Sequence, residues 1–398
     1  MTVSRLKDIP GIGVDKMGQA ADDAGNSDML RLENLDTDLR PPEEALEATL
    51  AAIGRDDANS YLPFLGTNDI RRAATSRISA TTGQPYDWTT QCVISAGGLS
   101  GILNALLAIL EPGDEVIIPA PYWVSYPDMT LMAEGTPVVV ECQEENDFKI
   151  TAAELEAAIT PKTKWVVLNS PSNPTGAAYS RAELRAIADV LLKHENVYVM
   201  SDDMYEHLVY DGFEFTTIAQ IEPKLKERTL TCNGVSKSYA MTGWRLGYAA
   251  GPKDLIKAIN KVQSQSSTHT SSISQAASVE ALNGPQDFLK ERAEVFKKRR
   301  DLVVAALNEC EGLSCKTPEG AFYVYPSCAG AIGKTTPDGK KIETDTDFVT
   351  YLLEAEGVAA VQGSAFGLAP YFRISYATSD AALTEACARI KRACAALK

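Results

Sequence analysis

Residues 233–251, NGVSKSYAMTGWRLGYAAG, place a single lysine, Lys237, among small and polar residues. The residues just before them, Thr229 to Cys232, predict a strand, and Trp244 to Ala250 form a second apolar run. A lysine held among apolar neighbours can lose its proton near neutral pH and attack a carbonyl carbon. Arg245 is a fixed cation that suits a phosphate or a carboxylate. Taken alone, the two residues are better explained as a solvated loop lysine and a surface arginine.

A candidate anion site precedes this stretch. Gln91 to Ser95 predicts a short strand, which runs into the turn AGG and then into a helix at residues 99–110. Free backbone N–H groups and the helix dipole make such a helix start attractive to a phosphate. By itself, this segment is better explained as a plain tight turn.

Predicted strands and helices alternate in the middle of the chain. The strands lie at residues 115–118, 136–140, 164–168 and 197–201, and the helices at residues 122–134, 152–159 and 181–194. This alternation predicts a mostly parallel sheet that is covered on both faces. Active sites of such sheets lie beyond the carboxyl ends of the strands. Polar residues follow three strands, at Asn169 to Gly176, Asp202 to Tyr205 and Lys237.

The remaining segments predict two domains. The N-terminal arm, residues 1–27, holds one short helix, and further helices are predicted at residues 41–53, 68–82, 255–282, 285–307, 346–356 and 381–397. A strand is expected at residues 318–325, and YFRISY, residues 371–376, predicts a strand that exposes Arg373. We predict a large domain at residues 46–290 and a small C-terminal domain at 291–398, with residues 1–45 forming an arm and part of the small domain.

The composition excludes several classes of protein. The chain has 398 residues and a net charge of −15, which is a poor match for nucleic acid or an anionic membrane. No apolar run approaches the roughly 18 residues of a membrane-spanning helix, and the first residues lack the apolar core of a signal peptide. The eight cysteines form no C-x-x-C pair, and there are three histidines, so we expect no metal site and no disulfide framework. The expected location is the cytoplasm.

Five motifs in order resemble the class I aminotransferases of fold type I, which bind pyridoxal 5'-phosphate (PLP). They are APYWVSYPDM (120–129), NSPSNPTG (169–176), SDDMYEHL (201–208), NGVSKSYAMTGWR (233–245) and YFRISYA (371–377). The resemblance runs from about residue 90 to the C-terminus and is strongest to the bacterial aspartate aminotransferase subgroup. It implies an α/β fold with a large PLP-binding domain, a smaller α+β domain and a homodimer with shared active sites.

The resemblance also implies roles for the cofactor residues. Lys237 would carry PLP and move protons, and Asp202 would pair with the pyridine nitrogen. Asp203 is the neighbouring alternative, but the family pattern Ser-Asp-x-x-Tyr selects Asp202. Tyr205 would donate a hydrogen bond to the 3'-oxygen of the ring, and the ring of Trp123 would stack on the pyridine and border the substrate.

Two further groups of residues are implied in the same way. Asn173 would contact both the 3'-oxygen and the substrate carboxylate, and Arg373 would bind the substrate α-carboxylate through its planar fork. The phosphate would be held by backbone and side-chain groups and, from the partner subunit, by a tyrosine; these residues are Gly98, Leu99, Ser236, Arg245 and Tyr61.

Two segments depart from the subgroup. It usually has G-E-P-D-F-D-T-P where this chain has LENLDTD, residues 32–38, and often a lysine for a distal carboxylate where this chain has Leu99. Either dicarboxylates bind weakly, or a cation of the N-terminal segment replaces that lysine. The candidates are Arg5, Lys7, Lys16 and Arg31.

The predicted function is a PLP-dependent aminotransferase with ping-pong chemistry, using an L-amino acid and a 2-oxo acid. Aspartate with 2-oxoglutarate or oxaloacetate is the first choice, and aromatic or prephenate-type substrates are the second. A PLP lyase, decarboxylase or racemase is an alternative, because one fold hosts many reactions. A PLP-sensing module of a transcription regulator would need a fused DNA-binding domain, for which the chain has neither a basic patch nor spare length.

Overall fold

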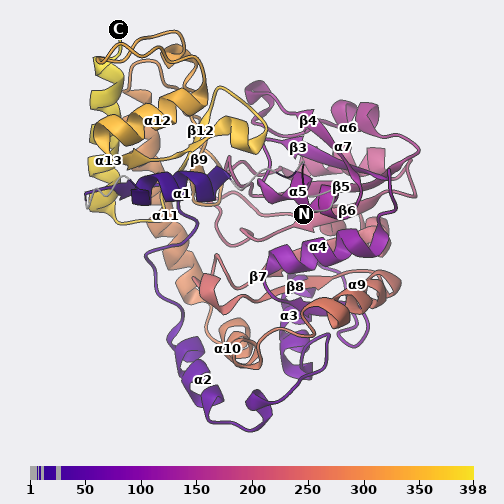
Figure 1. Ribbon diagram of the computed structural model, residues 1–398. Helices are drawn as coiled ribbons and strands as arrows, with labels where there is room; N and C mark the ends of the chain where they lie inside the picture. Colours follow the sequence, from indigo (N-terminus) through magenta and orange to yellow (C-terminus); the bar gives the residue numbers. More distant parts are fainter. Residues whose placement is uncertain (1–6, 8, 10–12, 24–27) are drawn as a thin grey trace.

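The computed structural model describes residues 7, 9, 13–23 and 28–398. Within them, seven strands form a central sheet in the order β2-β8-β7-β6-β5-β3-β4 (Figure 1). Their bounds are β2 (Cys92–Ser95), β3 (Glu115–Ala120), β4 (Thr136–Glu141), β5 (Thr163–Asn169), β6 (Tyr198–Asp202), β7 (Thr229–Gly234) and β8 (Gly247–Ala250). β8 pairs antiparallel with both of its neighbours, β2 and β7, and all the other pairs of this sheet are parallel. The prediction of a mostly parallel sheet is confirmed.

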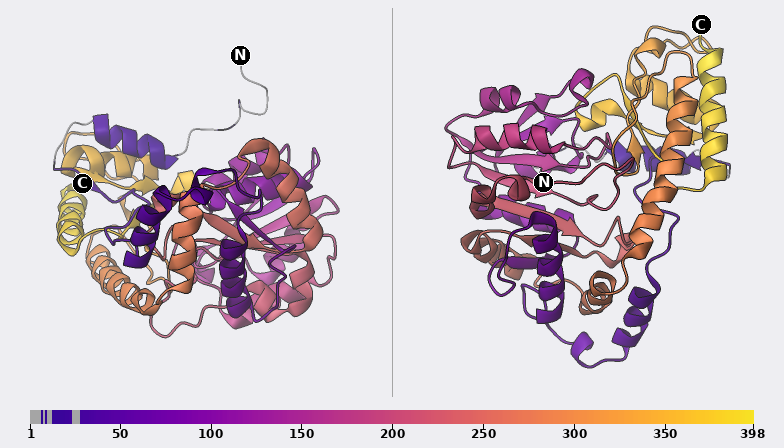
Figure 2. Two further views of the ribbon diagram at one scale, coloured as in Figure 1. Left: turned by 90° about the horizontal axis from the view of Figure 1, so that it is seen from below. Right: turned by 180° about the vertical axis from the view of Figure 1, so that it is seen from behind.

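Helices cover both faces of this sheet (Figures 1 and 2). In β5, Trp165 and Val167 belong to one buried cluster and Val166 and Leu168 to another, because successive strand residues point to opposite faces. The first cluster contains side chains of α4 (Gly98–Ile109), α5 (Ser125–Met132) and α9 (Lys253–Ser266). The second contains side chains of α6 (Ala152–Ala158), α7 (Arg181–Leu191) and α8 (Ile218–Ile221). Burial on both faces explains the near-continuous apolar strands in the sequence.

A separate hydrophobic core lies beside the sheet and contains most of the C-terminal third (Figure 2). Its elements are α11 (Asp287–Asn308), α12 (Asp345–Glu356), α13 (Asp380–Ala396) and a small antiparallel sheet of β9 (Tyr323–Val324), β11 (Val361–Gln362) and β12 (Phe372–Ser375). N-terminal elements join it, namely α1 (Gly13–Asp23) and β1 (Leu30–Arg31), which pairs with β10 (Val358–Ala359). These elements make up the small part of the molecule, and the seven-stranded sheet with its helices makes up the large part.

Three more helices complete the large part at the β2–β8 edge of the sheet. Helices α3 (Asn68–Thr82) and α10 (Ser272–Asn283) pack against each other, and α2 (Glu43–Ile53) packs on α10. Their buried side chains form a cluster with Tyr248 and Ala250 of β8. No helix of the described residues is long and apolar enough to cross a membrane.

The helix predicted at residues 255–282 is wrong in one respect, because it is two helices, α9 and α10. Thr268, in the connection between them, has a left-handed backbone with φ of 59°. The side chain of Ser271 then caps α10 by accepting a hydrogen bond from the backbone N–H of Ser274. Serine and threonine compete with helical hydrogen bonds and favour such caps, which explains why the serine-rich run between the helices ends one and begins the other.

The strand predicted at residues 318–325 is also shorter than expected. Only Tyr323 and Val324 form it, because the preceding backbone bonds to the large part instead. The N–H of Gly320 donates to the carbonyl oxygen of Gly176, and the N–H of Ala321 donates to that of Leu208. This segment therefore fastens the small part to the large one.

Candidate active site

A cavity of about 350 Å³ lies where β5, β6 and β7 end and helix α4 begins. The three segments that were predicted to follow strands all reach it, as expected for the carboxyl edge of a parallel sheet. Its described lining residues are Leu35, Asp36, Gly98, Leu99, Ile102, Trp123, Val124, Ser125, Tyr126, Asn169, Asn173, Asp202, Met204, Tyr205, Ser236, Lys237, Thr242, Arg245 and Arg373. All of the site residues named from the sequence are among them except Tyr61.

Lys237 follows β7 and is half-buried in this cavity. Its Nζ donates a hydrogen bond of 2.9 Å to the backbone oxygen of Leu35, which lies in the N-terminal segment. Burial lowers the pKa of Lys237 to about 8; the charge of Asp36 opposes this shift, and those of Arg373 and Arg245 add to it. A useful fraction of the amine is therefore neutral, and nucleophilic, near neutral pH.

Asp202, the last residue of β6, is a buried acid. Its Oδ2 accepts a hydrogen bond of 2.6 Å from the hydroxyl of Tyr126, and it forms no ion pair with any described residue. Burial raises the pKa of this carboxyl, and the hydrogen bond from Tyr126 opposes the rise. Asp203 does not line the cavity: its Oδ1 accepts a hydrogen bond of 2.7 Å from Ser201. Of the two neighbouring aspartates, Asp202 is the one placed for a ligand.

The sequence did not single out Tyr126, which lies three residues after Trp123 in the motif APYWVSYPDM and in the first turn of α5. Its ring meets that of Trp123 edge to face at 5.2 Å, so the two residues form one wall of the cavity. The spacing of three residues at a helix start was the available signal. Tyr205, which also lines the cavity, has its hydroxyl 2.9 Å from that of Tyr323.

Arg373 was expected to be exposed on its strand, and this expectation is wrong, because its side chain is fully buried. Its Nη1 donates a hydrogen bond of 2.9 Å to Oδ1 of Asn173, and its Nη2 donates one of 2.7 Å to the backbone oxygen of Glu33. The guanidinium lies 4.7 Å from the ring centre of Tyr323. Its Nε has no hydrogen-bond partner among the residues that the structure describes. A buried guanidinium with a free donor is suited to bind a carboxylate.

The other end of the cavity is a cradle at the start of α4. Arg245 has a left-handed backbone with φ of 52°. Its Nη1 donates a hydrogen bond of 3.1 Å to the backbone oxygen of Thr242. Gly97 has φ of 81°, and a Cβ there would overlap the Arg245 guanidinium. Glycine suits this left-handed backbone, and its missing side chain leaves room for the arginine beside the free N–H groups at the helix start. Gly98, Leu99 and Ser236 line the same end.

Leu99 and Tyr61 differ in their relation to the cavity. Leu99 lines it and is 38% exposed, whereas Tyr61 is 89% exposed and lies outside it. Of the cations suggested as substitutes for the missing lysine, Arg31 is already paired with Asp22 and Glu33 at 2.6 Å each. Lys7 and Lys16 are not among the lining residues, and Arg5 falls outside the described residues.

Comparison with known proteins identifies the family. Residues 28–390 match the family model described as aminotransferase class I and II. The chain belongs to this family. A "Probable aspartate/prephenate aminotransferase" from Rhizobium leguminosarum bv. phaseoli is 53% identical over 396 residues, which cover 100% of this chain and 98% of the relative. An "Aspartate aminotransferase" from Rhizobium meliloti (strain 1021) is 57% identical over 357 residues, which cover 90% of this chain and 87% of the relative.

Solved structures agree with this assignment. The crystal structure of the aspartate aminotransferase from Rhizobium meliloti aligns with a TM-score of 0.96 at 53% identity and covers 100% of both chains. The aspartate aminotransferase from Thermus thermophilus with maleate aligns with a TM-score of 0.91 at 35% identity and covers 99% of both chains. The fold type I assignment is thereby confirmed, and the enzyme is a PLP-dependent aminotransferase.

The cavity fits PLP on its own chemistry. A buried acid without an ion-pair partner, Asp202, suits a protonated pyridine nitrogen. The cradle of Gly97, Arg245 and the start of α4 suits a phosphate. Lys237 lines the same cavity, as the aldehyde of the cofactor requires. The residues present therefore match the charged and reactive ends of the cofactor.

Proposed function

We propose that this enzyme moves an amino group between L-aspartate and a 2-oxo acid, 2-oxoglutarate or oxaloacetate, in two half-reactions. The names of the relatives at 53% and 57% identity support aspartate as the donor. The observation that carries the proposal is Arg373, which lines the same cavity as Lys237. Its guanidinium is buried, and its Nε has no hydrogen-bond partner among the described residues. An α-carboxylate bound there would place the amine and Cα of an amino acid toward Lys237.

The chemistry divides between the cofactor and the protein. PLP, when bound, supplies an electron sink for the charge that develops at the substrate Cα. Lys237 is the proposed base that removes the proton from Cα and returns it, since an amine with a pKa near 8 can do both near neutral pH. When PLP is bound, Asp202 and Tyr205 would hold its ring and Trp123 would cover it, since all three line the cavity. Asn173 and Arg373 hold the substrate carboxylate.

The proposed reaction is tested with single half-reactions. Purified holoenzyme is mixed with one amino acid at a time without an acceptor, and the absorbance of the bound cofactor and the oxo acid released are measured. Aspartate should give about one equivalent of oxaloacetate per site, and 2-oxoglutarate should restore the starting spectrum. Continued turnover without any 2-oxo acid would show a lyase or decarboxylase instead.

A second candidate donor class, aromatic or prephenate-type substrates, is favoured by the lining of the cavity. Leu35, Leu99 and Ile102 are apolar, and Asp36 adds a negative charge in the same cavity. An unpaired distal carboxylate is costly to bury in such surroundings. The same half-reactions with phenylalanine and tyrosine measure how far this class competes with aspartate.

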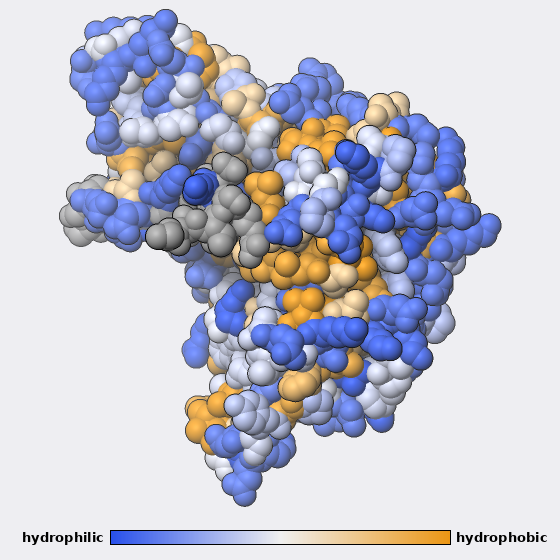
Figure 3. Space-filling model, turned by 45° about the vertical axis from the view of Figure 1, so that its right-hand side comes forward, coloured by the Kyte–Doolittle hydropathy of each residue, from blue (hydrophilic) through white to orange (hydrophobic). Residues whose placement is uncertain are grey.

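We also propose a homodimer in which Tyr61 reaches the phosphate site of the partner subunit. Tyr61 lies outside the cavity of its own chain, and large apolar side chains that are close to it in the sequence are exposed, namely Leu50 and Ile53 of α2 and Phe64. Figure 3 shows apolar surface at the lower end of the molecule, where α2 lies. Exposed apolar side chains that gather in one region are typical of a subunit interface.

The division into domains and the cellular location are likewise proposals. We propose residues 46–290 and 291–398 as the large and small domains, with residues 1–45 as an arm that joins the small domain. The separate hydrophobic cores of the two parts support this division. The eight cysteines are buried free thiols, which supports a reducing compartment such as the cytoplasm.

A further inference from the structure

A short turn of the large part, residues 143–149, has an unusual backbone. Asp147 and Phe148 both have left-handed conformations, with φ of 54° and 59°. Neither is glycine, and a bulky residue such as phenylalanine rarely adopts this region. Such a conformation persists where the surroundings hold it in place, and it commonly marks a functional position.

Phe148 is held by aromatic residues of the small part. Its ring meets those of Tyr325 and Tyr371 edge to face, at 5.5 and 5.2 Å. Those two tyrosines stack on each other at 5.2 Å, and Phe366 completes the buried cluster. Phe148 is thus an apolar anchor that the large part inserts into the small part.

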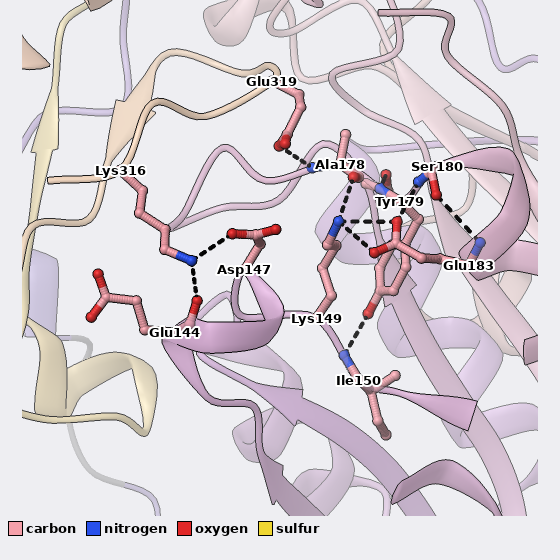
Figure 4. Close-up of polar contacts among 11 residues, drawn as sticks. Glu144, Asp147, Lys149, Ile150, Ala178, Tyr179, Ser180, Glu183, Lys316 and Glu319 are labelled. Atoms are coloured by element: carbon pink, nitrogen blue, oxygen red, sulfur yellow. Dashed lines mark hydrogen bonds and ion pairs between the residues drawn. The ribbon is translucent and has the colours of Figure 1, made fainter. Parts of the chain in front are cut away.

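Residues next to this anchor in the sequence make polar contacts to the small part (Figure 4). Lys316 of the small part pairs with Asp147 at 2.7 Å and also donates to the backbone oxygen of Glu144. The hydroxyl of Tyr371 donates 3.2 Å to Oε2 of Glu144. The side chains of Lys316 and Asp147 are 43% and 47% exposed, so salt in solution weakens their attraction.

The turn also contacts the loop that carries Asn173. The buried Lys149 pairs with Glu183 at 2.7 Å and donates 3.3 Å to the backbone oxygen of Ala178 (Figure 4). The N–H of Ala178 in turn donates 3.1 Å to Glu319 of the small part. The turn therefore lies between the loop of Asn173 and the small part, with contacts to both.

We propose that Phe148 and the Asp147–Lys316 ion pair are positioning residues that set the separation of Asn173 and Arg373, and with it the affinity for the substrate carboxylate. Tyr371 immediately precedes β12, which carries Arg373, and Tyr325 immediately follows β9, its neighbouring strand. A shift of the Phe148 anchor is therefore transmitted to the 2.9 Å contact between Arg373 and Asn173. This inference rests on the proposed role of Arg373 in binding the α-carboxylate.

Other contacts keep the two parts together without the turn. Arg300 of α11 pairs with Asp211 at 2.6 Å, and the N–H of Tyr122 donates 3.0 Å to the backbone oxygen of Phe366. Variants in the turn are therefore expected to loosen the contact between the parts and leave each part folded.

The test compares Phe148→Leu, Phe148→Tyr and Lys316→Met as holoenzymes. Half-reactions with aspartate give the apparent dissociation constant for the amino acid and the limiting rate, and the cofactor absorbance gives PLP retention. We expect Phe148→Leu to weaken amino-acid binding about 10-fold, with the limiting rate within about threefold and PLP retention unchanged. Phe148→Tyr should bind the amino acid nearly as tightly as the unmodified enzyme, because a tyrosine ring keeps the edge-to-face contacts.

The ion pair has its own test, which does not depend on the aromatic cluster. Lys316→Met should weaken amino-acid binding about threefold at low salt. The affinity of this variant for the amino acid should also depend less on salt concentration than that of the unmodified enzyme. Lys334→Met is the matched control, since Lys334 pairs with Glu311 at 2.6 Å within the small part. Unchanged substrate binding in both Phe148→Leu and Lys316→Met would overturn the inference. Arg373→Lys separates this from the proposed function: if it too left binding unchanged, the carboxylate role of Arg373 itself would be wrong.

Discussion

Replacing Leu99 with lysine is expected to shift the enzyme toward dicarboxylate substrates. Leu99 lines the cavity at the start of α4. The charged lining residues of positive sign in the described structure are Lys237, Arg245 and Arg373, and each has a proposed task on the cofactor or the α-carboxylate. No cation of the described lining is therefore left for a second carboxylate.

The size of the effect follows from the exposure of the site. Two unit charges 4 Å apart attract by about 1 kcal/mol in water and by about 4 kcal/mol at an effective dielectric constant near 20. Leu99 is 38% exposed, so the lower part of this range applies. Asp36 lines the same cavity and would share the new charge. We expect about 1.4 kcal/mol, which is a factor of about 10 in kcat/KM for aspartate relative to phenylalanine.

The assay is the ratio of the two kcat/KM values, because a ratio cancels differences in active-site content. Leu107→Lys is the control, since Leu107 is a 44% exposed leucine of the same helix that does not line the cavity. If Leu99→Lys left the ratio where Leu107→Lys leaves it, the distal carboxylate would be recognised elsewhere. In the homodimer proposed above, the partner subunit would then be the place to search for the missing cation.

Three further predictions address the remaining site residues. The rate at which PLP reacts with the apoenzyme should rise with pH and level off above about 8, since only the neutral amine of Lys237 attacks. Asp36→Asn should lower the midpoint of this pH profile, because the charge of Asp36 raises the pKa of Lys237. A midpoint near the pKa of an ordinary lysine would contradict the lowering of this pKa by burial. Asp202→Asn should retain PLP yet slow the half-reaction about 100-fold, for a charged hydrogen bond of about 3 kcal/mol, whereas Asp203→Asn should be nearly unaffected; the reverse order would reassign the two aspartates. Mixing inactive Tyr61→Ala and Lys237→Ala protomers should restore activity, because each heterodimer would hold one intact site, and verified heterodimers without activity would place Tyr61 outside catalysis.

The sheet could be predicted from the sequence because its strands are buried on both faces. Runs such as Trp165 to Leu168 are continuously apolar, and each is followed by a turn and a segment with helical periodicity. The same alternation located the ends of β5, β6 and β7, where Asn169, Asp202 and Lys237 lie. Motif resemblance then distinguished Asp202 from Asp203, which no periodicity could have done.

Features that depend on long-range packing were missed. The exposure of Arg373 was wrong because a four-residue strand gives no sign of the aromatic rings that enclose it. Asp36 and Leu35 were not expected in the cavity, since their place there depends on contacts about 200 residues along the chain. The left-handed backbone of Phe148 has no sequence signal either, because glycine or asparagine is the usual residue there.

The N-terminal segment shows why the chain can diverge there and keep its chemistry. Leu35 receives the hydrogen bond of Lys237, and Glu33 receives that of Arg373, but both accept through backbone oxygens. Backbone acceptors place no demand on side-chain identity. The departure from G-E-P-D-F-D-T-P at residues 32–38 therefore leaves the contacts to both cations in place. What it changes is the side chains that the segment presents to the cavity, Leu35 and Asp36, which lie with Leu99 in the lining. Divergence in this segment is accordingly expected to alter which substrate side chains the cavity accepts and to leave the proposed proton transfer at Lys237 unchanged.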